Sequence, residues 1–187
     1  MRRTQQSESG REIMFIKKYK PFIIPILFLI LIDQTAKIII SKVFMQYEFD
    51  ILGEILRFAP VLNIRLSYLG NFIDILSAPA IAVLINIFAL YIFLSGYSLY
   101  KAKKTNTGFW VKVIMISGTA GCLCSLTDKL FWGGSLDFLQ IPNFFTFDLK
   151  DCYITIAWAL FVVIGILHNK EISVEEYFRF CCNKFRL

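Results

Sequence analysis

The fold of this chain is decided by residues 22–40, which read FIIPILFLILIDQTAKIII. A basic stretch precedes the run, as in a secretory signal peptide, but no small-x-small cleavage site follows it. Instead the chain continues through the polar step from Asp33 to Lys37 into a further apolar segment. As one helix, residues 21–44 are long enough to cross the roughly 30 Å hydrocarbon core of a bilayer. We therefore predict an uncleaved membrane span at residues 21–44.

The composition of the whole chain is typical of a small integral membrane protein. Of its 187 residues, 57% are hydrophobic and only 18% are charged, whereas a soluble domain is about half apolar and about a quarter charged. Three further apolar segments predict spans at about residues 75–100, 109–127 and 151–167. Gly118, Ala120 and Gly121 would let the third of these four spans pack closely against a neighbour.

The net charge of +6 is distributed as in a multi-pass membrane protein. Lys and Arg gather in an N-terminal arm (residues 1–20), in the connection after the second span and in a tail (residues 169–187). Cytoplasmic segments carry such an excess of positive charge, so we expect the arm, that connection and the tail to be cytoplasmic. The placement favours contact with anionic membrane lipids and not with nucleic acid.

Residues 45–74, between the first two spans, are acidic where the other connections are basic. They contain Glu48, Asp50, Glu54 and Asp74, and residues 47–51 alternate as in a half-buried strand. We interpret them as an extracytoplasmic β/amphipathic cap on the bilayer surface. The predicted fold is an all-α membrane protein with four transmembrane helices, within residues 21–168, and this small cap. Residues 128–150 are interpreted as a polar loop, since Gly133-Gly134 and Pro142-Asn143 are turn signals.

Little in the chain predicts metal or disulfide chemistry. It has five cysteines, an odd number, and a single histidine, His168. The cysteines and the histidine do not have the spacing of a metal site. Cys122 and Cys124 fall within an apolar span, where cysteine behaves as a small hydrophobe. We expect no metal and no cofactor.

Two aspartates on either side of the polar loop are the leading candidates for chemistry. Asp137 lies in GSLDFL (residues 134–139) and Asp151 in FDLKD (residues 147–151). A carboxylate near hydrocarbon is costly, which marks it as a candidate functional residue. Two that converge suggest acid–base chemistry at a membrane face. The alternative is structural, because acidic residues such as Asp148 and Asp151 are favoured in the first turn of a helix.

Other charged residues of the spans have structural explanations as well. Asp33 and Lys37 are four positions apart and share a helix face. They predict either a simple intrahelical ion pair or an anchor for the bundle beneath a site. Asp128 and Lys129 end the third span, where snorkelling to the interface would explain them.

In order and spacing, these residues resemble the motifs of bacterial lipoprotein signal peptidase (signal peptidase II). The resemblance covers about residues 22–167 and rests on three motifs: Asp33-Gln34-x-x-Lys37, Asp128-Lys129 with residues 133–138, and Phe147-x-Leu149-x-Asp151. It implies an intramembrane aspartic peptidase that removes the signal peptide of prolipoproteins after their cysteine has received diacylglycerol. The partners would be lipidated prolipoproteins and membrane lipids, and we expect a monomer.

The resemblance also implies roles for particular residues. Asp137 and Asp151 would be the catalytic pair, near the extracytoplasmic face of a bacterial cell membrane. The cap would help to hold the substrate. The positions that match supporting parts of the motifs are Asp33, Lys37, Asn63, Asp128, Lys129 and Asp148.

The chain departs from the family pattern at several places. A small-residue stretch with Gly is replaced after Asn63 by residues 64–68, which include Arg65, and a Gly-Asn pair is replaced by Cys124-Ser125. Lys129 stands where the family has Arg, which keeps the charge but loses the bidentate fork. Asp148 stands where the family has Asn, and we expect its charge to make the catalytic pair hold its proton more tightly.

Two other functions stay open at this point. A catalytically weakened relative would bind lipidated peptides or act as a membrane scaffold. A small transporter or proton-coupled channel would use Asp33, Lys37 and Asn86 as its polar path.

Overall fold

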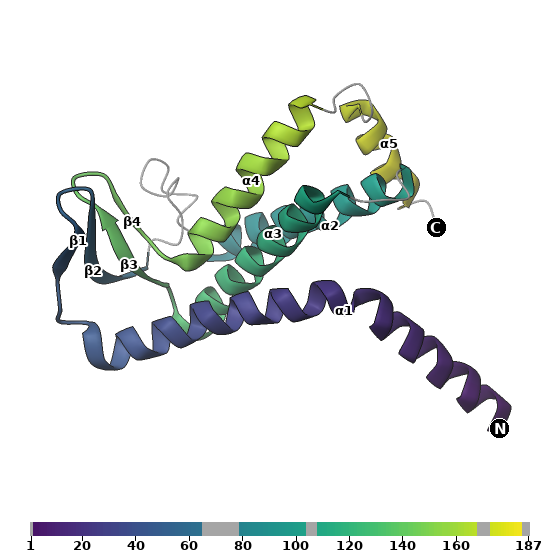
Figure 1. Cartoon of the computed structure of the whole chain (residues 1–187), viewed down its shortest axis with the longest axis horizontal. Coiled ribbons are helices and arrows are strands. Elements are labelled where there is room, and N and C mark those ends of the chain that lie inside the picture. The colour runs from purple at the N-terminus through teal and green to yellow at the C-terminus, as the bar shows by residue number, and fades with distance from the viewer. Residues whose placement is uncertain (1, 65–78, 104–107, 168–172, 185–187) are drawn as a thin grey trace.

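The computed structural model of the chain describes residues 2–64, 79–103, 108–167 and 173–184. Within these ranges, helices at Tyr19–Phe44, Ala80–Lys103, Phe109–Trp132 and Leu149–Leu167 are long and apolar enough to cross a membrane. The prediction of an all-α membrane protein with four spans and a small cap is confirmed. Figure 1 shows a small sheet at one end of the long helices, whereas α5 and the start of α1 lie at the other end.

The helices extend beyond the predicted spans at several ends. Helix α1 (Arg2–Ile39) includes residues 2–20, which we expected to form a separate arm, and continues as a π-helical turn, η1 (Ile40–Phe44). Helix α3 (Phe109–Thr127) likewise continues as η4 (Asp128–Trp132). The other helices are α2 (Pro79–Lys103), α4 (Leu149–Leu167) and a short amphipathic α5 (Val174–Lys184).

Helix α3 lies at the centre of the bundle and packs against α1, α2 and α4. Its glycines allow the close approach that the sequence predicted. A Cβ on Gly118 would lie 2.7 Å from the Phe93 ring of α2, and one on Gly121 would lie 2.5 Å from Ile154 Cγ1 of α4. The outer helix surfaces are apolar and exposed, for example at Leu31, as expected for side chains that face lipid.

The cap is a four-stranded antiparallel sheet in the order β1-β2-β3-β4. Strands β1 (Phe49–Leu52) and β2 (Leu56–Asn63) come from the predicted cap region. Strands β3 (Ser135–Ile141) and β4 (Phe145–Phe147) come from residues 128–150. Our interpretation of that segment as a polar loop was wrong. The sheet forms because β3 pairs with β2, a non-local contact that an isolated segment does not reveal.

The sheet is attached to the bundle by a small apolar cluster. Leu136 and Phe138 of β3 are buried with Ile40 of η1, and Phe58 and Leu149 pack against them. Successive side chains of a strand point to opposite faces, so Asp137 points away from this cluster. It is nevertheless almost completely buried, with 3% of its surface exposed. The cluster therefore fixes β3 with Asp137 turned toward the start of α4.

Candidate active site

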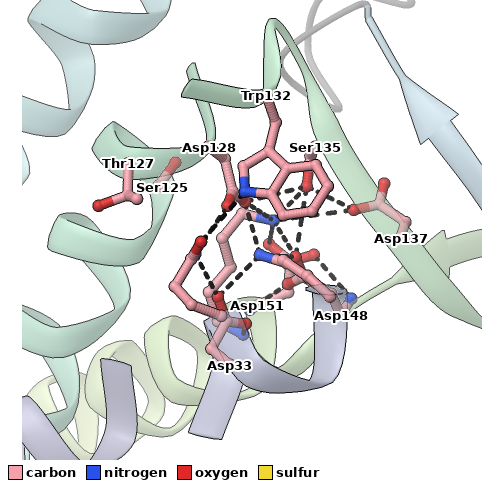
Figure 2. A network of polar contacts seen from close by, with 12 residues as sticks. Asp33, Ser125, Thr127, Asp128, Trp132, Ser135, Asp137, Asp148 and Asp151 are labelled. Carbon is pink, nitrogen blue, oxygen red and sulfur yellow. Dashed lines mark hydrogen bonds and ion pairs between the residues drawn. The ribbon is translucent and has the colours of Figure 1, made fainter. Parts of the chain in front are cut away.

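Three carboxylates meet where the sheet joins the helix bundle. One oxygen from each of Asp137, Asp148 and Asp151 lies within 4.8 Å of the others. Asp137 comes from β3, whereas Asp148 immediately precedes α4 and Asp151 lies in its first turn. Figure 2 shows their side chains in one network of polar contacts. The structure thus brings Asp137 and Asp151, the two leading candidates from the sequence, into the same site.

The start of α4 is fixed by reciprocal hydrogen bonds between two of these aspartates. The backbone N–H of Asp151 donates to Oδ1 of Asp148 over 3.1 Å, and the backbone N–H of Asp148 donates to Oδ2 of Asp151 over 3.2 Å. This is the arrangement of a capping box, in which an N-cap residue and the residue three positions later satisfy each other's free N–H groups. Asp33 adds a third bond, because its Oδ1 accepts from the backbone N–H of Lys150. The structural role that we considered for Asp148 and Asp151 is therefore present.

A buried lysine of α1 holds three carboxylates together beneath the site. Nζ of Lys37 lies 2.8 Å from Asp33 Oδ2, 2.6 Å from Asp128 Oδ2 and 2.7 Å from Asp148 Oδ2. Both Asp33 and Lys37 are fully buried. The ion pair expected from their spacing is present, but it is part of a larger network that connects α1 with the C-terminal end of α3 and the start of α4. Gln34 extends this network, since it donates to Asp128 and accepts from the indole N–H of Trp132.

Each oxygen of Asp137 accepts a hydrogen bond. Ser135 donates to Oδ1 over 2.7 Å, and Nδ2 of Asn63 donates to Oδ2 over 3.1 Å. Burial raises the pKa of Asp137 above its ordinary value of 3.8, and the charge of Asp148 adds to this rise. The positive charge of Lys150 and the two hydrogen bonds oppose the rise but do not cancel it. Asp137 is therefore disposed to hold a proton more tightly than an exposed aspartate does.

Lys150, which the sequence reasoning missed, contacts most of the site. Its Nζ lies 2.5 Å from Asp148 Oδ2, 3.7 Å from Asp137 Oδ1 and 3.8 Å from Asp151 Oδ1. It also donates to Ser135 Oγ, and only 4% of Lys150 is exposed. A signal was available: this lysine lies between two aspartates at the start of an apolar span. We had assigned it to the end of the polar loop.

Three carboxylates at this separation are also a pattern that can hold a metal ion. In this protein the ammonium group of Lys150 lies among the same three carboxylates. The positive charge that such a cluster requires is thus supplied by a side chain of the chain itself.

An open apolar groove of about 670 Å³ runs beside Asp151. Phe144, Phe145 and Phe147 of the β3–β4 hairpin form one side of it, and the first turns of α4 form the other. Asp151 keeps 26% of its side chain exposed. Residues from both the sheet and the bundle therefore line a groove that leads to one of the two candidate aspartates.

The sequence profile of signal peptidase (SPase) II matches residues 25–167. This chain belongs to the signal peptidase II family. Membership supports lipoprotein signal-peptide processing and an aspartic-protease chemistry, and with the four spans it indicates a multi-pass protein of a bacterial membrane. No curated protein sequence matches the chain closely enough to count as a relative.

Two solved structures share the fold. A bacterial membrane enzyme solved by the in meso method at 2.3 Å resolution is 21% identical, with a TM-score of 0.64 over 83% of this chain and 93% of that one. A second bacterial membrane enzyme, solved by the same method at 1.9 Å, is also 21% identical, with a TM-score of 0.59 over 78% and 92% of the two chains.

Two departures from the signal peptidase II motifs contact each other. Lys129, in place of Arg, donates from Nζ to Oγ of Ser125 over 2.6 Å. Ser125 stands in place of the Asn of the Gly-Asn pair. Lys129 is a shorter cation than Arg, and Ser125 has a shorter polar side chain than Asn. The two shorter side chains contact each other directly. Arg65, at another departure, lies outside the described residues.

Proposed function

We propose that this chain is an intramembrane aspartic endopeptidase that removes signal peptides from diacylglyceryl-modified prolipoproteins. Asp137 and Asp151 are its catalytic pair. One observation carries the proposal: oxygens of the two carboxyl groups lie within 4.8 Å of each other at the end of a four-span bundle. At a separation of this size one water molecule can reach both carboxyl groups, which the acid–base chemistry requires.

Peptide hydrolysis by two aspartates requires that they differ in protonation. Two like charges this close in a largely buried site cannot both ionise cheaply, so the pair shares one proton. The ionised aspartate takes a proton from the attacking water, and the protonated one donates its proton to the carbonyl oxygen of the scissile bond. The carbon–nitrogen bond of the resulting diol then breaks: the leaving amine takes a proton from one aspartate, and a hydroxyl of the diol gives its proton to the other as the product carboxylic acid forms, so the pair again holds one proton. The titration belongs to the pair and not to either residue.

The surroundings of the pair are suited to an apolar substrate. The groove beside Asp151 is lined by phenylalanine side chains and by Cys152, Thr155 and Ile156 of α4. Apolar walls with one polar group at the end are typical of sites that bind a largely apolar ligand and orient one bond of it. A signal peptide and the acyl chains of a lipidated cysteine are ligands of this kind.

The proposed orientation follows from the charges at the two ends of the bundle. Lys101 and Lys103 end α2 at the end away from the sheet. Positive charge marks the cytoplasmic side of a bacterial membrane protein. The sheet and the aspartate pair would then lie near the extracytoplasmic face, where secreted prolipoproteins emerge. We expect both termini to be cytoplasmic.

The test measures processing of a lipidated prolipoprotein by the purified full chain in detergent, followed by gel shift. Asp137→Asn and Asp151→Asn should each lower turnover by at least about 100-fold, because each removes one acid–base group. The matched control is Glu175→Gln, an exposed acidic residue of α5, which should leave turnover unchanged. All variants are first checked for a folded state by thermal unfolding in the same detergent.

Full turnover by either aspartate variant would refute the peptidase proposal. A non-catalytic relative would bind the lipidated peptide equally well with and without both substitutions and would never cleave it. The transporter alternative needs Asn86 in the polar path, but Nδ2 of Asn86 donates to the Ala82 carbonyl of its own helix.

A further inference from the structure

Lys150 places a positive charge where the proposed mechanism requires a shared proton. Its Nζ is almost equally distant from the two catalytic carboxylates, 3.7 Å from Asp137 Oδ1 and 3.8 Å from Asp151 Oδ1. A cation at this distance favours the ionised form of a carboxylate. By itself, the charge of Lys150 would therefore favour loss of the proton that the aspartate pair has to keep.

Asp148 offsets that effect, because its carboxylate contacts the same ammonium group. Its Oδ2 lies 2.5 Å from Lys150 Nζ and 2.7 Å from Lys37 Nζ. Burial would raise the pKa of Asp148, but the charges and hydrogen bonds of Lys150 and Lys37 lower it below its ordinary value of 3.8. Asp148 therefore stays ionised, and its negative charge lies beside the positive charge of Lys150.

Asp148 and Lys150 are also close to each other in the sequence. Asp148 immediately precedes α4, and Lys150 lies in the first turn of that helix. The two residues are two positions apart and carry opposite charges. The two side chains are in direct contact.

We propose that Asp148 and Lys150 work as one unit, an ion pair that sets the pH range in which Asp137 and Asp151 share a single proton. The proposal rests on the peptidase function proposed above. Lys150 moves this range to lower pH and Asp148 moves it to higher pH, so that the two effects offset each other. Both are positioning residues, since they act through the catalytic pair.

Other charged and polar groups face Lys150 from each neighbouring element and stay in place in the test. The backbone N–H of Lys150 donates to Asp33 of α1, and Asp128 Oδ2 of η4 lies 3.4 Å from Nζ. Among the described residues, the other groups around the site include Lys37 of α1, Lys129 of η4, Asn63 of β2 and Ser135 of β3. Since they are common to all variants, a difference in pH dependence between variants isolates the Asp148–Lys150 pair.

The experiment compares pH profiles of kcat/KM for the full chain acting on a lipidated prolipoprotein. Lys150→Met removes the cation and should move both limbs of the profile upward by about 1–3 pH units. Asp148→Asn removes the anion and should move both limbs downward. The double variant should return to within a few tenths of a unit of the wild-type profile, and Lys150→Arg, which keeps the charge, should lie close to wild type. The control variant is Lys112→Met. Lys112 is an exposed residue near the start of α3.

Three results would overturn the proposal. Lys150→Met could lower the rate without moving either limb, which is what a purely structural role predicts. The double variant could show the same displacement as Asp148→Asn alone. This second comparison decides the question even when Lys150→Met does not fold, because the double variant leaves no unpaired charge at the two positions. Lys150→Arg could shift the limbs as far as Lys150→Met does.

Failure of the peptidase function itself would look different. In that case the wild-type chain would not cleave the substrate at any pH, or Asp137→Asn would remain fully active. The role of the ion pair alone would be rejected by a different set of results. In that case the wild-type chain cleaves the substrate, Asp137→Asn is inactive, and the pH profile of Lys150→Met is not displaced.

Discussion

Asn63 donates a hydrogen bond from Nδ2 to Oδ2 of Asp137 over 3.1 Å. Asn63 is the last residue of β2, and it lies opposite Ser135 in the β2–β3 pairing. Ser135 in turn donates to the other oxygen of Asp137. The pairing of two strands thus supplies a donor to each oxygen of one carboxylate of the proposed catalytic pair and fixes its orientation.

Asn63→Ala should lower kcat by about 10- to 100-fold, since a hydrogen bond to a charged group contributes roughly 1.5–3 kcal/mol. The reason is loss of orientation of Asp137, so KM for the lipidated prolipoprotein should change little. Steady-state kinetics in detergent measure both constants. The matched control is Asn86→Ala. Among the contacts described, the side chain of Asn86 bonds only within its own helix. An equal loss of kcat in the control would contradict the assignment.

Lys37→Met should destabilise the folded protein by about 3–5 kcal/mol, because it leaves three buried carboxylates without their shared cation. Unfolding by denaturant in mixed micelles measures the change in the free energy of unfolding. Lys103→Met is the control, since Lys103 makes a partly exposed ion pair with Glu176 at the other end of the bundle. Such pairs contribute about 0–1 kcal/mol. If the two variants lose similar amounts of the free energy of unfolding, Lys37 has no special role.

Asp148 should make the stability of the protein depend on pH in the acid range. Its folded-state pKa is lower than its ordinary value of 3.8, because Lys150 and Lys37 overcome the opposing effect of burial. Its contribution to stability is therefore complete above about pH 5 and is lost as the pH falls through 3.8 toward the folded-state pKa. Melting temperatures of the wild type and of Asp148→Asn should differ at pH 7 and begin to converge only as the pH falls below about 3.8. A difference that stays constant over this range would contradict the lowered pKa.

Gly121→Ala should impair activity by displacing the start of α4. A Cβ at this position would lie 3.2 Å from the backbone nitrogen of Ile154 and 3.2 Å from the backbone oxygen of Lys150, in addition to its contact with the Ile154 side chain. Backbone atoms cannot move aside as a side chain can, so we expect a loss of about 1–3 kcal/mol in stability. We also expect a clear fall in kcat, because Asp151 is carried by the same turn. Gly165→Ala, with nothing within 4 Å of its Cβ, should leave both unchanged.

The extent to which the site could be predicted differs from residue to residue. Asp33 and Lys37 are four positions apart on one helix, so their contact follows from helix geometry alone. Asp137 and Asp151 could be selected because carboxylates beside apolar segments are costly. The environment of Lys150 could not be predicted, because a lysine between two aspartates is compatible with a solvated turn as well as with a buried ion pair.

The sequence by itself determined the four membrane spans and the choice of the two aspartates. Both depend on local properties, the length of an apolar run and the cost of a charge beside it. Tertiary structure alone decided that β3 joins the cap sheet, and it decided which charges surround Lys150. The reason is that burial of an ion is tolerated only where partners from other elements meet it. One such partner is Asp128 of η4, whose Oδ2 lies 3.4 Å from Lys150 Nζ.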